Sequence, residues 1–233
     1  MTVEVKVNGV SSRTVRGCLL TTLGDWSGSA PRFVEETVYG MNGVNRTIEA
    51  YGETERKLGF HCESFEAVGQ IIRFFQGMDR RLELWPVPDS FYYFDFKESE
   101  YQFHHKQSWD VTITLAIKPF RYLLGVEPIS LTDSGAIRNL GDVFSEPRVT
   151  IYGSGATSLT IGKQVMRLTL DTKATIECRH GFQNIYDKND VIKNSIRTSG
   201  TFFEIPASSD PIGVVLGDGI SRVEIEPRWR FQV

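Results

Sequence analysis

The sequence has little of what several classes of protein require. Its 233 residues include three cysteines, Cys18, Cys62 and Cys178, an odd number at distant positions that suits reduced thiols better than a disulfide framework or a zinc site. The 26 lysines and arginines and 29 acidic residues leave a net charge of −3, without a basic tail or stripe. Sequence-independent binding to nucleic acid depends on such a basic surface. These absences argue against a disulfide scaffold, a zinc module and a DNA-binding protein.

Long apolar runs are also missing. No run approaches the ~20 residues of a membrane-spanning helix, and the opening MTVEVKVNGV lacks the basic segment and apolar core of a secretory signal. We therefore expect a chain that folds in a cytoplasm and does not insert into a membrane. The hydrophobic share of 40% and charged share of 24% are typical of a folded chain, and its length suits two domains.

Most of the chain alternates apolar and polar residues, which is the pattern of β-strands. Valines alternate over residues 3–7, and Asn8-Gly9 directly after them suits a two-residue hairpin turn. A second Asn-Gly pair, at residues 42–43, lies between two further strand-like segments. The first half is therefore predicted to form an antiparallel sheet system with a hairpin.

One segment has the period of a helix instead. Apolar residues recur at helical spacing over residues 65–76, Ser64 is placed as the N-cap, and Gly77 is placed to end the helix. Gly69 inside the segment costs roughly 1 kcal/mol relative to alanine. We predict a single helix at about residues 65–76.

Two prolines with similar surroundings divide the chain. Pro119 and Pro227 each follow an alternating segment that ends in Ile, a charged residue and Pro. Because proline has no amide hydrogen, both are predicted to end strands. Clean periodicity is lost over residues 121–142, and we place the domain boundary near residues 122–128, which predicts domains at 1–124 and 125–233. The second half shows short strand patterns joined by Gly and Asp turns, which indicates a β-sandwich. The predicted fold class is therefore mainly β.

The candidates for chemistry are weak. GSGATS, residues 153–158, follows a strand but leads into another strand, whereas a dinucleotide site needs a helix there, so a hairpin turn is the preferred interpretation. His104 and His105 are adjacent and would point to opposite faces of a strand, and His61 and His180 have no spaced partner. We expect no metal, cofactor or catalytic site.

Two groups of residues keep alternative functions open. Glu98 and Glu100 could form the carboxylate pair of a glycosidase, although their polar setting favours solvated hairpin residues. The aromatic stretch FYYFDF, residues 91–96, could stack against sugars or bases, but a core strand or a subunit contact explains it better. The tryptophans that could serve a sugar-binding module are Trp26, Trp85, Trp109 and Trp229.

The order of several short motifs resembles the distal tail (Dit) proteins of phages with long non-contractile tails. These motifs are ITLAIKPFRY at residues 113–122, NLGDVFSEPRVTIYGSG at 139–155, SGTFFEIPAS at 199–208 and VEIEPRWRF at 223–231. The resemblance covers nearly the whole chain, and its most specific parts are KPF, NLG and PRWR. It implies an N-terminal β-sandwich with a helix and a hairpin, followed by a galectin-like β-sandwich.

The resemblance also implies a function. Six copies would form a ring at the tail tip of the virion, with the N-terminal domains continuing the tail tube and DNA passing through the lumen. The C-terminal domains would carry receptor-binding or baseplate proteins, and a tail-associated fibre or lysin protein would dock below. Two such rings could also pair back to back. The alternative is a carbohydrate-binding adhesion module, although the chain lacks the long insertions of saccharide-binding relatives. Interface residues stay unknown, with the strand edges in residues 91–105 as candidates.

Overall fold

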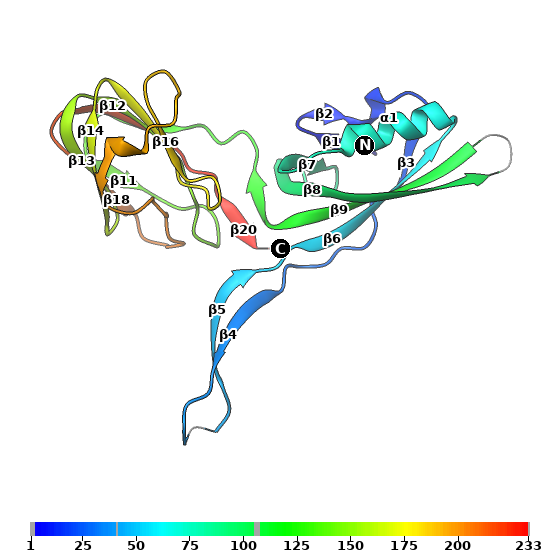
Figure 1. The fold of residues 1–233 in the computed structure, drawn as a ribbon, viewed down its shortest axis with the longest axis horizontal. Helices are drawn as coiled ribbons and strands as arrows, with labels where there is room; N and C mark the ends of the chain where they lie inside the picture. The colour runs from blue at the N-terminus through cyan, green and yellow to red at the C-terminus, as the bar shows by residue number, and fades with distance from the viewer. Residues whose placement is uncertain (1–2, 41, 105–107, 233) are drawn as a thin grey trace. The chain divides into compact units, whose positions relative to one another are not determined.

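The computed structural model describes residues 3–40, 42–104 and 108–232. The chain divides into two compact units (Figure 1), Met1–Leu124 with Gln232–Val233, and Gly125–Phe231. Strands dominate both units, and the described residues include a single α-helix. The predicted mainly β class is thus confirmed. Within the same residues, no helix has the length and apolar character needed to span a membrane.

The first unit is built on one eight-stranded sheet in the order β2-β1-β7-β8-β9-β6-β3, with β20 also paired to β9. Asn8 and Gly9 both have positive φ and join β1 to β2 by the predicted two-residue turn. The buried face carries the core of the unit, including Phe60, Phe75 and Phe94. The strands of the first unit are β1 (Val5–Val7), β2 (Val10–Ser11), β3 (Cys18–Thr22), β6 (Thr54–Cys62), β7 (Arg80–Leu84), β8 (Ser90–His104) and β9 (Ser108–Leu123). Of β20 (Arg230–Gln232), only Gln232 belongs to this unit.

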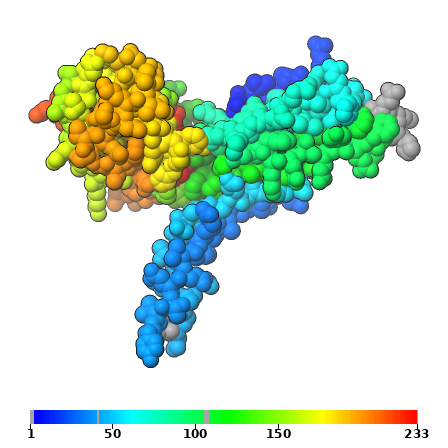
Figure 2. Space-filling view, viewed as in Figure 1, coloured from blue at the N-terminus to red at the C-terminus, as the bar shows by residue number. Residues whose placement is uncertain are grey.

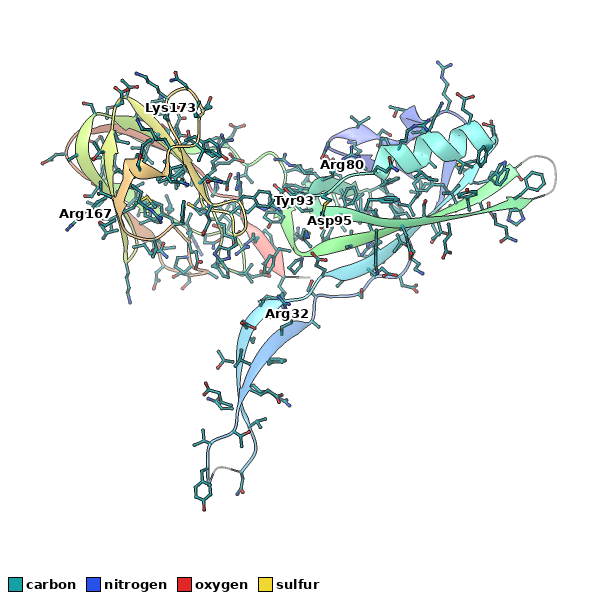
Figure 3. All side chains as sticks on the ribbon, viewed as in Figure 1. Arg32, Arg80, Tyr93, Asp95, Arg167 and Lys173 are labelled. Atoms are coloured by element: carbon teal, nitrogen blue, oxygen red, sulfur yellow. The ribbon has the colours of Figure 1, made fainter. Side chains whose placement is uncertain are left out.

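The predicted helix is α1 (Phe65–Phe75). The Ser64 side chain accepts a hydrogen bond from the Ala67 amide at 3.2 Å and so caps its first turn. At the other end, Arg80 donates to the carbonyls of Phe74 at 2.6 Å and Gln76 at 2.8 Å (Figure 3). These bonds satisfy carbonyls that the helix itself leaves open. The apolar stripe of α1 packs on the sheet core.

The structure does not require glycine at position 69 of the helix. A Cβ atom at this position would meet only the flexible end of Arg73, 3.3 Å away. Since glycine inside a helix costs about 0.8–1 kcal/mol relative to alanine, we expect Gly69→Ala to raise the free energy of unfolding by roughly 0.5–1 kcal/mol. Urea denaturation measures this change. The control Gly77→Ala should destabilise instead, because Gly77 has φ +123°. A less stable Gly69→Ala variant would show that the helix packs against a neighbour at this position.

The prediction that Pro119 ends a strand is wrong. β9 continues past Pro119, and the proline lies in a bulge of this strand. Between the pairs Tyr92–Arg121 and Phe94–Ile117, β9 has three residues where β8 has one. Strand β6 no longer pairs with β9 beyond Ile117. A bulge is one of the few sites where a sheet accepts a residue without an amide hydrogen. Pro227 does follow the end of a strand, as predicted, because β19 (Ile220–Glu226) stops before it.

The hairpin of the first unit stands apart from the main sheet. Strands β4 (Pro31–Glu36) and β5 (Asn45–Tyr51) pair only with each other and form a two-stranded sheet. They extend away from the main sheet of this unit (Figure 1). The sequence placed these segments in one sheet system, which is wrong, because every residue of β4 and β5 except Pro31, Ala50 and Tyr51 is exposed and none is fully buried. We call this hairpin the arm.

The second unit is a β-sandwich of two five-stranded sheets, as the strand pattern predicted. The sheet orders are β10-β19-β12-β15-β16 and β11-β18-β13-β14-β17. Inward residues such as Ile151, Leu159 and Phe203 are fully buried. The strands not yet located are β10 (Ile129–Leu131), β11 (Gly135–Ile137), β12 (Arg148–Gly153), β13 (Gly155–Ile161), β14 (Gln164–Leu170), β15 (Lys173–Glu177), β16 (Asn184–Tyr186), β17 (Arg197–Ser199) and β18 (Ile212–Leu216).

The GSGATS segment is not the hairpin turn that was predicted. Ser154 separates β12 from β13, but β12 belongs to one sheet and β13 to the other. The chain therefore crosses between the two layers of the sandwich at this point. Gly153 allows the crossing, since a Cβ there would lie 2.2 Å from the carbonyl oxygen of Gly219. A strand follows the glycines, so the backbone amides of a helix N-terminus are not available for a phosphate here.

Candidate assembly site

The arm stands out from the rest of the first unit (Figure 2), and it exposes apolar side chains along its length. Phe33 and Ile48 lie directly opposite each other on one face, and their exposed fractions are 47% and 51%. Val34, on the other face, and Tyr39, beyond the end of β4, are exposed as well. A two-stranded ribbon also leaves both of its outer edges without hydrogen-bond partners. Isolated hairpins are marginal in water, and open apolar edges favour pairing with another chain.

The base of the arm is held by the KPF motif of β9. The Lys118 amine forms ion pairs with Glu53, which follows β5, and with Asp95 of β8 at 2.6 Å. Burial lowers the pKa of Lys118, but the hydrogen bonds with Asp95 and Glu53 outweigh it and raise this pKa above its usual value. Lys118 is therefore charged, and it links the arm to the main sheet.

The two residues after Lys118 hold the arm in other ways. The Pro119 carbonyl, which a bulged strand leaves available, accepts a hydrogen bond from the Ser29 hydroxyl at 3.1 Å. The Phe120 ring packs edge-on against Tyr51 with ring centroids 5.6 Å apart. Ser29 precedes β4 and Tyr51 ends β5. All three residues of KPF therefore hold the base of the arm, so the motif anchors the arm and does not end a strand.

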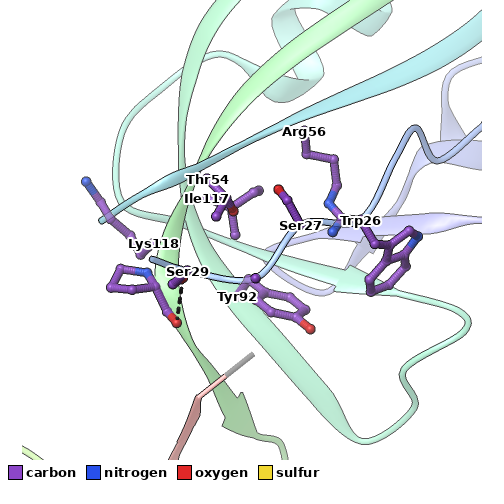
Figure 4. A pocket seen from close by; sticks show the side chains of 10 residues that line it. Trp26, Ser27, Ser29, Thr54, Arg56, Tyr92, Ile117 and Lys118 are labelled. Carbon is purple, nitrogen blue, oxygen red and sulfur yellow. Dashed lines mark hydrogen bonds between the residues drawn. The ribbon is translucent and has the colours of Figure 1, made fainter. Parts of the chain in front are cut away.

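A small pocket of about 120 Å³ lies beside this anchor (Figure 4). Its walls include Ser29, Lys118 and Arg56, whose guanidinium lies 3.9 Å from the centre of the Trp26 ring. Arg56 is only 6% exposed, and its Nη1 atom has no hydrogen-bond partner among the described residues. Burial lowers the pKa of this guanidinium. The pocket thus holds a desolvated positive charge at the base of the arm.

Removing that charge is expected to stabilise the isolated chain. In Arg56→Met the aliphatic packing on Trp26 is kept, while a buried group without its hydrogen bond, which costs about 1–3 kcal/mol, is removed. The lost cation–π contact is worth roughly 0.5–1 kcal/mol, so we expect a net gain of about 1 kcal/mol. Urea unfolding tests this, with Arg81→Met as the control, since Arg81 lies over the Phe91 ring but is exposed. A marked loss of stability in Arg56→Met would contradict this view of the pocket.

In the second unit, the NLG, FFEIPAS and PRWR motifs contact one another. The Asn139 side-chain amide donates to the carbonyls of Val143 and Ile205 at 3.0 Å and of Pro206 at 3.2 Å. Its oxygen accepts from the Gly141 amide at 2.8 Å. Asn139 is buried, so these bonds satisfy groups that water does not reach. The NLG motif thereby ties the entry of the sandwich to the FFEIPAS segment.

The PRWR motif completes the same cluster. Arg230 donates to the Phe144 carbonyl at 2.7 Å, pairs with Glu146 at 3.1 Å and lies over the Phe144 ring at 4.3 Å. Both Arg230 and Glu146 are buried. His180 bridges Glu146 and Glu204 at 3.1 and 3.0 Å. We call Asn139, Gly141, Glu146, Ile205 and Arg230 the motif cluster; its role is to hold together the second unit.

The three described histidines each lie within hydrogen-bonding distance of a carboxylate. His61 and His104 flank Asp110, at 2.9 and 2.8 Å, on an exposed face of β6, β9 and β8. Hydrogen bonding from His61 lowers the pKa of Asp110. The described part of the chain holds no group of three or more His, Cys, Asp or Glu side chains arranged for a metal ion. His105 lies outside the described residues.

The candidate carboxylates and most of the aromatic stretch are not assembled into a ligand site. Glu98 and Glu100 are exposed on β8, opposite Thr114 and Thr112. An exposed strand does not supply the apolar pocket that a catalytic acid needs. The first four rings of FYYFDF, at residues 91–94, are buried between β7 and β9, so they cannot form the predicted open edge.

The tryptophans are dispersed. Trp229 is buried, Trp26 covers Arg56, and Trp85 lines a separate shallow pocket of the first unit. Trp109 is half-buried against the core, and its ring contacts three exposed aromatic rings, those of Phe65, Tyr101 and Phe103. The sequence missed this group because its members come from α1, β8 and β9.

The cysteines are closer together than their sequence positions suggest. All three are free thiols, and Cys178 is fully buried. Burial raises the pKa of Cys178 to about 12. Cys18 and Cys62, by contrast, lie directly opposite each other on β3 and β6. The predicted reduced thiols agree with the three free cysteines, and nothing in the sequence indicated that Cys18 and Cys62 are neighbours.

Comparison with known proteins places this fold. No family model and no curated protein matches the chain. Among solved structures, the Dit protein of phage SPP1, described as a paradigm of the hub adsorption apparatus in phages that infect Gram-positive bacteria, aligns with a TM-score of 0.70 at 11% identity. The alignment covers 97% of this chain and 98% of that one.

Two baseplate structures in an activated conformation align as well. One is of phage P2 with Ca, with a TM-score of 0.61 at 6% identity, and covers 100% of this chain and 99% of that one. The other is of phage p2 with Sr, with a TM-score of 0.57 at 8% identity, and the alignment covers 97% of this chain and 98% of that one. The resemblance seen in the sequence motifs is thus confirmed for the fold. The chain has, over nearly its whole length, the fold of phage distal tail and baseplate proteins.

Proposed function

We propose that six copies of the chain close into a ring that joins the tail tube of a phage to its baseplate. The role is structural and not catalytic, and DNA passes through the lumen without specific binding. The likeness to hub and baseplate proteins supports this proposal. The mildly negative net charge of −3 is compatible with a channel that does not retain DNA.

The observation that carries the proposal is the arm. Phe33 and Ile48 are half exposed, both outer edges of the hairpin are open, and KPF fixes its base to the main sheet. A closed ring uses one patch of each copy against a different patch of the next. An arm held only at its base is suited to reach such a patch on a neighbouring copy, where its apolar residues would be buried.

The likeness to hub and baseplate proteins supports the remaining parts of the proposal. The first unit forms the ring, and the second unit, as a galectin-like sandwich, carries receptor-binding or baseplate proteins. A tail-associated fibre or lysin protein docks at the ring, which is assembled in the host cytoplasm. The alternative of a carbohydrate-binding module has less support, because the FYYF rings that suggested it are buried.

Immunogold labelling of intact virions tests the proposal. Antibodies raised against the purified chain are expected to label the end of the tail that lies away from the head. Antibodies against a major head protein provide the control for accessibility. Labelling of the head or of the whole tail length, or virions that lack the chain by mass spectrometry, would contradict a hub at the tail tip.

A further inference from the structure

Two thiols of the first unit are placed for a bond that the reduced chain does not contain. Cys18 of β3 and Cys62 of β6 are directly paired across antiparallel strands, and their sulfur atoms are 2.9 Å apart. Opposed residues in such strands have Cα atoms about 4.5–5.5 Å apart, which lies within the range of about 4.4–6.8 Å found in disulfides. A small approach of the two sulfurs is therefore enough to join them.

The two thiols differ in access and in acidity. Cys18 is half-buried on β3, an edge strand of the sheet, whereas Cys62 is fully buried. A hydrogen bond from Cys62 lowers the pKa of Cys18, against the opposing effects of burial and of Glu63. The same hydrogen bond, together with burial, raises the pKa of Cys62. Cys18 is thus the more accessible and more acidic thiol, with Cys62 behind it, which is the arrangement of an attacking and a resolving cysteine.

We propose that Cys18 and Cys62 form a reversible disulfide when the chain meets a low-molecular-weight disulfide such as oxidised glutathione. The Cys18 thiolate attacks one glutathione sulfur, the glutathione S–S bond breaks, and one glutathione thiolate leaves. The Cys62 sulfur then attacks the Cys18 sulfur of this mixed disulfide and displaces the second glutathione thiolate. The two protons lost by the cysteines pass to the two glutathione thiolates. Two protein thiols are oxidised and one glutathione disulfide is reduced to two thiols.

The position of this bond gives it a structural consequence. The chain leaves the main sheet after β3, forms the arm, and returns to the sheet as β6. A bond between Cys18 and Cys62 therefore closes the loop that contains the whole arm and its base. Such a cross-link restricts the unfolded chain and fixes an edge strand that, among the described strands, pairs only with β6. The Cys18–Cys62 bond is absent in a reducing compartment and forms in an oxidising one.

The test uses the purified full chain, reduced and then incubated with oxidised glutathione. Free thiols are alkylated, and the linked peptides are mapped by mass spectrometry. We expect loss of two of the three thiols and a single cross-linked peptide pair that contains Cys18 and Cys62. Three thiols still free, a mixed disulfide that stays on Cys18, or a cross-link between chains would each overturn the proposal.

Single substitutions separate the two steps. Cys62→Ser should stop at glutathione bound to Cys18, Cys18→Ser should not react, and the control Cys178→Ser should form the cross-link as the unaltered chain does. Oxidation should raise the unfolding midpoint of the first unit by roughly 5–10 °C in the unaltered chain and in Cys178→Ser. An equal rise in Cys18→Ser would show that the cross-link is not its cause. The thiol count, the cross-linked peptides and the unfolding midpoint are all measured without ring assembly. If they show no Cys18–Cys62 bond, the proposed function is not affected.

Discussion

A chain that carries both Phe33→Lys and Ile48→Lys is expected to stay monomeric at concentrations where the unaltered chain assembles. The two residues face each other on one side of the arm, so the substitutions place two like charges where an interface would bury apolar surface. Burying an unpaired ammonium group is strongly unfavourable. We expect the subunit affinity to fall by roughly a hundredfold or more, which corresponds to about 2.8 kcal/mol. Analytical ultracentrifugation measures the distribution of species.

The matched control places lysines on the second unit. Val165 and Val215 have exposed fractions of 46% and 52%, close to those of the arm residues, and both pair with Thr160 on the same face of their sheet. Val165→Lys with Val215→Lys should assemble normally. Both double variants should keep the thermal stability of the monomer, since none of the four side chains is buried. If the variant with Phe33→Lys and Ile48→Lys assembled normally, the arm would not be part of the subunit interface.

Gly141→Ala is expected to destabilise the second unit by about 3 kcal/mol or more, because overpacking against backbone leaves no side chain free to move. A Cβ at Gly141 would lie 2.1 Å from the carbonyl oxygen of Arg230. Moving these backbones apart would also disturb the hydrogen bond from the Gly141 amide to Asn139 and the contact of Arg230 with Glu146. One added methyl group therefore acts on the whole motif cluster.

Gly213→Ala is the control for the same substitution in the same unit. An added Cβ at Gly213 meets nothing within 4 Å, and this strand residue has no positive φ. It should change stability by less than about 0.5 kcal/mol. Guanidinium unfolding of the full chain, followed by hydrogen–deuterium exchange of peptides from the second unit, compares the two variants. Equal stabilities would show that the NLG and PRWR segments do not need close contact.

Features set by neighbouring residues were predictable from the sequence. The Ser64 cap and the apolar spacing of residues 65–76 depend only on the helix itself, and α1 occurs where they placed it. The turn at Asn8-Gly9 needs two positive φ angles, which these residue types accept. The alternating pattern of the second half likewise led to the sandwich, because inward residues such as Leu159 must be apolar whatever their strand pairs with.

Features that depend on distant pairing were missed. Pro119 was expected to end β9, because the bulge that accommodates it is defined by its register with β8. The change of sheet at Ser154 depends on which strands flank β12 and β13, and the turn residues do not contain that information. The proximity of Cys18 and Cys62 follows from the pairing of β3 with β6 across the arm. No local signal in the sequence marks any of these three.

In the candidate assembly site, too, local motifs were visible in the sequence, whereas contacts between distant residues were not. The KPF, NLG and PRWR motifs were noticed in the sequence, yet their roles are visible only when their partners are in place. Lys118 meets Glu53 and Asp95, Asn139 meets Ile205, and Arg230 meets Glu146. The arm itself was recognisable as a hairpin, but its separation from the main sheet required the structure. The sequence signal that could have shown it is the adjacent pair Phe33 and Val34, because neighbouring strand residues point to opposite faces, whereas a strand of a packed sheet keeps its apolar residues on one face.

The mass of the purified chain in solution shows whether six copies assemble. We expect a dominant species of six times the 26.4 kDa chain mass, or twice that mass if two rings pair back to back, at micromolar concentration and moderate salt. Sedimentation velocity with multi-angle light scattering gives this mass without labels. A chain that stays at 26.4 kDa across this range, or that settles as a dimer, would contradict a hexameric ring held together by the arm.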